Sequence, residues 1–157
     1  MRPYPDEVLR AIQSGVIAHF APELDSNYGK AQFAFSMLLF NIATRDYDTA
    51  VPDLLEANST LRGLLAEARS ALDAIGSPPA QDGIATIDAL PAPAPSLKLT
   101  DLRAENDALR AAVASLSPLI EPAADEPPLA PLRELRANLY AWLAADAKKR
   151  SFPILSA

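Results

Sequence analysis

Two stretches of the chain, residues 51–72 and 99–116, share one helical pattern and one polar interruption. In each stretch apolar residues are spaced alternately three and four apart, which is the heptad repeat of a seam between packed helices. An asparagine, Asn58 or Asn106, stands within each seam where an apolar residue is expected, and Leu-Arg follows three residues later. An asparagine in such a seam lowers stability but sets the register, because an opposing amide satisfies it. The two stretches therefore predict how helices align, and they predict no chemistry.

Charged residues beside the seams agree with this interpretation. Glu105 falls at a g position and Arg110 at the following e position, the arrangement in which parallel neighbours form ion pairs. Arg62 is the matching e residue of the first stretch, so Glu105 is equally suited to pair with Arg62. The predicted interaction seam consists of Leu54, Asn58, Leu61, Arg62, Leu65, Leu102, Glu105, Asn106, Leu109, Arg110 and Val113.

The seams are compatible with two arrangements. The two stretches can lie parallel within one chain, Asn58 beside Asn106, because an extended linker of about 20 residues at about 3.3 Å per residue spans a helix of roughly 35 Å. Alternatively, each stretch can meet its copy in a second chain. We favour a bundle that dimerises through at least one of the two stretches.

Apolar residues at helical spacing, together with proline, glycine, serine and asparagine at the expected ends, predict an all-α fold. We expect a helical bundle of about five helices in a single domain, residues 1–157. A polar joint follows the second helix, a proline ends or kinks the fourth at position 118, and the residues after the fifth are expected to pack back. The predicted helices are 5–20, 27–45, 50–75, 97–117 and 131–149, with a Pro/Ala-rich linker at 77–95.

Composition limits the cellular setting. The 157 residues include no cysteine and carry a net charge of −6, which suits a reducing compartment and argues against binding to phosphate backbones. The most apolar run, residues 31–43, is shorter than the roughly 20 residues that a bilayer crossing needs. The N-terminal residues lack the pattern of a signal peptide. We expect a cytoplasmic protein without nucleic-acid or membrane partners.

The sequence contains no recognisable catalytic constellation. His19 is the single histidine, and no metal-binding, nucleophile or nucleotide motif is present. The pair Asp46 and Asp48 fits the ends of helices better than a cation site. We therefore expect no enzyme activity, no cofactor and no metal, and we assign no catalytic residue.

Residues 31–43 are apolar nearly all round a helix, which predicts a helix surrounded by others. Asn41 lies opposite the one polar strip and is expected to be buried, with its amide bonded to a neighbouring helix or to backbone. An alternative function follows, in which the bundle binds a small molecule in an apolar cavity. That cavity would be lined by Phe33, Met37, Phe40 and Asn41.

The opening PYPDEVLRAI, the two Asn-x-x-Leu-Arg helices and the closing LRANLYAWLAADAKKR resemble small all-helical bacterial proteins of unknown function. Relatives of that kind are found alongside phosphotransferase-like and acyl-CoA-dehydrogenase-like enzymes. The resemblance implies an accessory role beside a metabolic enzyme, and it carries over no catalytic position. The leading prediction is a non-catalytic assembly or accessory protein that self-associates, preferably as a dimer, or binds a metabolic enzyme through apolar helix faces.

Overall fold

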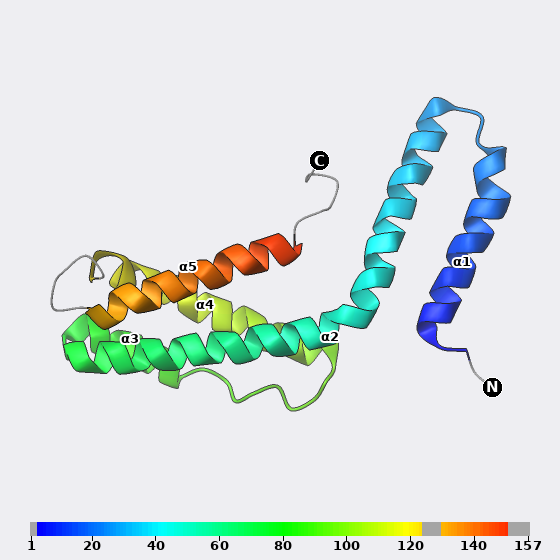
Figure 1. The fold of residues 1–157 in the computed structure, drawn as a ribbon. Coiled ribbons are helices and arrows are strands. Elements are labelled where there is room, and N and C mark those ends of the chain that lie inside the picture. Colours follow the sequence, from blue (N-terminus) through cyan, green and yellow to red (C-terminus); the bar gives the residue numbers. More distant parts are fainter. Residues whose placement is uncertain (1–2, 124–129, 151–157) are drawn as a thin grey trace. The chain divides into compact units, whose positions relative to one another are not determined.

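The computed structural model describes residues 3–123 and 130–150. Within these ranges the chain is all-α and has no strand, which confirms the predicted fold class (Figure 1). The expected packing of the C-terminal tail lies outside the described residues. The elements are α1 (Pro5–Phe20), the 3₁₀ helix η1 (Ala21–Glu23), α2 (Asn27–Ile75), α3 (Pro78–Asp88), α4 (Leu99–Ala123) and α5 (Ala130–Arg150).

The chain divides into two compact units, Met1–Asp53 and Leu54–Ala157. The boundary falls within α2, next to Pro52. Proline has no N–H to donate to the preceding turn, so the helix lacks one hydrogen bond at this point. We call the two parts the N-terminal unit and the C-terminal unit.

The N-terminal unit is a helical hairpin. Helix α1 begins at Pro5, and the Glu7 carboxylate accepts a hydrogen bond of 3.0 Å from the backbone N–H of Tyr4. Helix α2 begins after Ser26, whose Oγ accepts from the N–H of Gly29 at 2.9 Å. Figure 1 shows α1 and the first half of α2 running antiparallel. We refer to residues 3–53, which comprise α1, η1 and the first half of α2, as the hairpin.

The predicted helices 27–45 and 50–75 form one helix of 49 residues, so the polar joint between them is wrong. Arg45, Asp46 and Asp48 are exposed on the surface of this helix. Polar residues interrupt an apolar pattern without preventing helical backbone, because exposed charges remain hydrated. The predicted end of the helix is confirmed: α2 stops at Ile75, and Gly76 adopts a left-handed φ of 66°.

The predicted linker 77–95 is wrong in its first half, because residues 78–88 form α3. Pro78 and Pro79 occupy the first turn. Backbone N–H groups there have no acceptor within the helix, so their absence in proline removes no hydrogen bond. The Ser77 hydroxyl accepts from the N–H of Ala80 at 3.4 Å and caps the helix. A β-carbon at Gly83 would lie 3.0–3.1 Å from side chains of Leu72 and Leu116, so glycine permits this close approach.

In the C-terminal unit the second half of α2 lies parallel to α4 and antiparallel to α5 (Figure 1). Asn58 bonds Asn106 near the start of this arrangement, and Glu56 pairs with Lys149 at 2.7 Å. The buried core lies between the four helices of this unit. Its members are Leu61, Leu64, Leu65, Ala68, Ala71, Leu72, Ala80, Ile84, Leu109, Ala112, Leu116, Ile120, Leu132, Leu135 and Leu139.

Helix α4 continues through Pro118 to Ala123, so its predicted end at residue 117 is wrong. The Ser117 hydroxyl donates to the Val113 carbonyl at 3.1 Å within the same turn. Leu116 and Ile120, on either side of the proline, are buried in the core. Burial of this apolar face outweighs the single lost backbone hydrogen bond.

Pro52→Ala should stabilise α2 by about 1–3 kcal/mol, because it restores a helical hydrogen bond and removes the ring clash of an interior proline. Amide hydrogen exchange of residues 46–56 should slow accordingly. Pro93→Ala, the same change in the non-helical segment before α4, is the matched control and should leave exchange in α2 unchanged. Unaltered exchange in the Pro52→Ala protein would contradict a helix that continues through this position.

Candidate functional site

Asn58 and Asn106 meet inside the C-terminal unit, where their exposed fractions are 4% and 3%. Nδ2 of Asn106 donates to Oδ1 of Asn58 at 2.7 Å. Nδ2 of Asn58 donates to the backbone carbonyl of Leu102 at 3.0 Å. Of the two arrangements that the seams allowed, the structure has the parallel pairing within one chain.

The Glu105 carboxylate, 7% exposed, joins three segments of this unit. Oε1 accepts from Nε of Arg62 at 2.7 Å, and Oε2 accepts from Nδ2 of Asn58 at 3.2 Å. Oε2 also accepts from the N–H of Ala94 at 2.9 Å, and Nη2 of Arg62 donates to the Pro91 carbonyl at 2.9 Å. Glu105 thus pairs with Arg62, and together they hold the segment between α3 and α4 against the bundle.

Two opposing effects act on the pKa of the Glu105 carboxyl. Burial raises the pKa of its carboxyl, because a poorly hydrated site disfavours the ionised form. The Ala94 N–H, the Arg62 guanidinium and the Asn58 amide stabilise the carboxylate and together hold that pKa below its ordinary value. The buried group is therefore a carboxylate at neutral pH, matched by its partners.

Arg110 extends the polar network to α5. Its Nε donates to Oδ1 of Asn106 at 2.8 Å, and its Nη2 donates to Oδ2 of Asp146 at 2.7 Å. The guanidinium also lies 4.9 Å from the ring centroid of Trp142, a cation–π distance. Among the described residues, every buried side-chain nitrogen and oxygen has a hydrogen-bond partner. The network is complete within this chain.

All of the predicted seam residues lie in the C-terminal unit, and their burial shows how the seam is used. Seven are buried: Asn58, Leu61, Leu65, Leu102, Glu105, Asn106 and Leu109. The other four, Leu54, Arg62, Arg110 and Val113, are half-buried. The seam is therefore filled by helices of its own chain.

The residues of the alternative ligand cavity lie in the hairpin. Phe33, Met37 and Phe40 are half-buried on one face of α2. Asn41 is exposed, so the expectation that it is buried is wrong. Its predicted bond to a neighbouring helix is confirmed, because Nε2 of Gln13 in α1 donates to Oδ1 of Asn41 at 2.5 Å.

The hairpin itself is the feature that the sequence reasoning missed. No residue from position 3 to position 53 is buried. The apolar character of residues 31–43 was evident, but it predicted helices of the same chain on all sides. Nine large apolar side chains of the hairpin are exposed: Tyr4, Val8, Ile12, Ile17, Phe20, Tyr28, Phe35, Leu39 and Tyr47.

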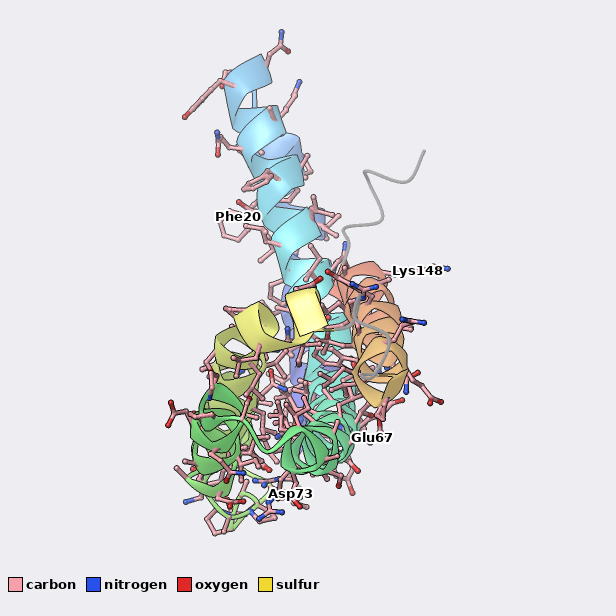
Figure 2. All side chains as sticks on the ribbon, turned by 90° about the vertical axis from the view of Figure 1, so that its left-hand side faces the viewer. Phe20, Glu67, Asp73 and Lys148 are labelled. Carbon is pink, nitrogen blue, oxygen red and sulfur yellow. The ribbon has the colours of Figure 1, made fainter. Side chains whose placement is uncertain are left out.

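Figure 2 labels Phe20, one of the exposed apolar side chains of the hairpin, and three exposed charged residues of the C-terminal unit, Glu67, Asp73 and Lys148. His19 is exposed on α1. In the part of the chain that the structure describes, no three His, Cys, Asp or Glu residues are grouped to hold a metal ion. The helices of that same part are all too short or too polar to cross a membrane.

Comparison of this chain with protein-family models, curated proteins and solved structures finds no match. The function proposed below therefore rests on the burial, contacts and charges of this chain's own residues.

Asn58→Asp should destabilise the C-terminal unit by about 2–4 kcal/mol at pH 7. The substitution keeps the shape of the side chain but places a carboxylate against Glu105 and removes the donor to Leu102. Urea unfolding measures the loss, which should shrink on acidification because protonation relieves the repulsion. Asn138→Asp, an exposed change on α5, is the control. Equal effects of the two variants would contradict the role of the buried network.

Glu105 should also make stability depend on pH. Its pKa is lower in the folded state, so its stabilisation is complete above the ordinary glutamate pKa of about 4.3 and is lost as pH falls through the folded value. The free energy of unfolding of the native chain should exceed that of Glu105→Gln at pH 7, and the difference should shrink below about pH 4. Glu67→Gln, at an exposed position of α2, should show a much smaller difference at pH 7.

Proposed function

We propose that this chain is a non-catalytic assembly or accessory protein that self-associates, or binds a metabolic enzyme, through the apolar surface of its hairpin. One observation carries the proposal: the hairpin has no buried residue between positions 3 and 53 and exposes nine large apolar side chains. The C-terminal unit, with its own buried core, serves in this proposal as the stable body.

The size of the exposed apolar surface supports association. Five of the nine side chains are aromatic, and an aromatic side chain offers about 150–250 Å². With about half of each side chain exposed, the set presents on the order of 800 Å², the area that one partner contributes to a standard interface.

Physical stability gives a second argument. Two helices that only half-bury their apolar side chains gain little from packing, and isolated helices of this length are only marginally stable in water. Covering the apolar side chains with a partner would supply the missing burial, about 25 cal/mol for each Å² removed from water. Association is therefore expected to order the hairpin as well as to join the subunits.

The polar groups support a structural role. Asn58, Asn106 and Glu105 are buried and bonded to each other, to Arg62 and to the backbone, an arrangement that holds helices in place. The resemblance to bacterial proteins found alongside metabolic enzymes makes such an enzyme the heterologous partner class within this proposal. A cytoplasmic location belongs to the same proposal and rests on the cysteine-free composition.

The association should be visible in mass and in amide protection together. Light scattering at micromolar concentration should give a mass near twice the chain mass of 16.7 kDa. On dilution, hydrogen exchange in residues 5–47 should accelerate by mass action, whereas residues 61–72 of the independent core should be unaffected. The core amides thus act as the internal control.

A monomeric mass at every concentration, with hairpin amides whose protection does not change on dilution, would contradict self-association. If the same chain then gained no hairpin protection from the enzymes encoded beside it, the accessory role would be contradicted as well.

A further inference from the structure

The segment that joins α3 to α4 is tied to the bundle at both ends. Residues 89–98 contain no helix or strand, and Figure 1 shows them as an irregular trace between the two helices. Asp88, the last residue of α3, pairs with Arg69 at 2.8 Å. At the other end the Ser96 hydroxyl donates to Asp101 of α4 at 2.6 Å. We call residues 89–98 the strap.

One ion pair holds the middle of the strap. Nη2 of Arg62 donates to the Pro91 carbonyl at 2.9 Å, and Oε2 of Glu105 accepts from the Ala94 N–H at 2.9 Å. Arg62 and Glu105 also bond each other at 2.7 Å. Among the described residues, residues 91–95 form no other hydrogen bond. We call Arg62 and Glu105 the clasp.

Prolines make the strap depend on the clasp. Pro91, Pro93 and Pro95 have no N–H, so Ala92 and Ala94 supply the only two backbone donors between positions 91 and 95. Prolines also restrict the conformations of a released strap, so less entropy is lost when it closes again. The composition of the strap therefore suits repeated opening and closing under the control of two side chains.

Little apolar burial opposes the opening of the strap. Leu90 is half-buried against the core, whereas Pro91, Pro93, Pro95 and Leu97 are exposed. The members of the buried core all lie in the helices of the C-terminal unit. A segment with few buried contacts opens at a lower free energy than the core does. The four helices therefore lose little packing when the strap leaves them.

We propose that the strap opens as one unit when the Glu105 carboxylate is neutralised, while the helices of the C-terminal unit stay folded. The strap is then an acid-releasable cover over Glu105. Its ends stay attached to α3 and α4, so release is reversible. This device goes beyond the proposed association of the hairpin and does not depend on it.

The charges around Glu105 make it the group of the clasp that responds to acid. Among the described residues, Arg62 is the charged side chain that stabilises the carboxylate, and its guanidinium keeps its charge in acid. The other two partners, the Ala94 N–H and the Asn58 amide, do not titrate. The strap itself carries one charged residue, Lys98, at its end.

Carboxylates on the elements around the strap have partners of their own. They are Asp88 of α3, Asp101 of α4 and Asp146 of α5, bonded to Arg69, Ser96 and Arg110 respectively. None of these bonds holds residues 91–95. Acid therefore acts on the middle of the strap through Glu105. Because the pKa of Glu105 is lowered in the closed state, its contribution is lost as pH falls through that lowered value.

Hydrogen exchange read by NMR tests the proposal at single amides. Between about pH 5 and pH 3 the protection of the Ala94 amide should fall about tenfold, because a hydrogen bond to a charged acceptor becomes one to a neutral acceptor. Amides of residues 61–72 in the core should keep their protection. In Glu105→Gln the Ala94 protection should already be low at pH 5 and should change little with pH.

Arg69→Gln is the matched control for this measurement. It removes the exposed ion pair with Asp88 at the end of α3 and leaves the clasp intact. The Ala94 amide of this variant should therefore retain the pH profile of the native chain.

A second pair of variants leaves the clasp side chains unchanged. Ala94→Pro removes the N–H that Glu105 accepts, and Ala92→Pro removes an N–H that bonds no described residue. Each alanine already precedes a proline, which favours extended backbone, so a proline ring suits both positions. Trypsin should cleave after Lys98 about tenfold faster in Ala94→Pro than in the native chain, because cleavage follows the open population. Ala92→Pro should be cleaved at the native rate.

Three results would overturn the proposal. The first is loss of protection at Ala94 only together with the core amides, because the strap would then open only when the bundle unfolds. The second is a pH profile at Ala94 that is flat in the native chain or unchanged in Glu105→Gln. The third is equal cleavage of the two proline variants, which also decides the matter if Glu105→Gln fails to fold. None of these results bears on association of the hairpin.

Discussion

The buried hydrogen bonds among Asn58, Asn106 and Glu105 are the constraint on which the C-terminal unit depends. An apolar interior accepts an amide or a carboxylate only when its hydrogen bonds are complete, and a shift of either helix by one turn would leave both groups unsatisfied. The leucines alone would tolerate such a shift. The polar contacts therefore select one parallel alignment of α2 and α4, and through Arg62 and Ala94 they also set the path of the intervening segment.

The two units differ in how far they bury their apolar side chains. The C-terminal unit encloses leucines, alanines and isoleucines between four helices, whereas the hairpin encloses nothing among its described residues. Pro52, where α2 lacks a hydrogen bond, lies next to the boundary between them. In the proposed assembly role, the buried core of the C-terminal unit would supply stability and the apolar side chains of the hairpin would supply the associating surface.

Heptad spacing in the second half of α2 is completed by α4 of the same chain. The bond between Asn58 and Asn106 sets the register of these two helices.

Local signals predicted the helices well where they were strong. Pro5, the apolar spacing of α1 and Gly76 placed their elements correctly, because capping and left-handed backbone act within a few residues. Local signals failed at Pro118, which lies inside a helix because Leu116 and Ile120 are buried beside it. At Pro78 the signal was local but was not recognised: Ser77 caps the helix and proline suits its first turn.

The sequence by itself determined that the chain is helical, that two stretches carry matching seams and that Asn58 and Asn106 stand at the same position in each. It also indicated that residues 31–43 are apolar on every side. Only the tertiary structure showed that the two seams pack against each other within one chain and that Glu105 forms its ion pair with Arg62. It also showed that no described residue of the hairpin is fully buried. Periodicity records which face of a helix avoids water, whereas the neighbour that covers that face depends on contacts between residues distant along the chain.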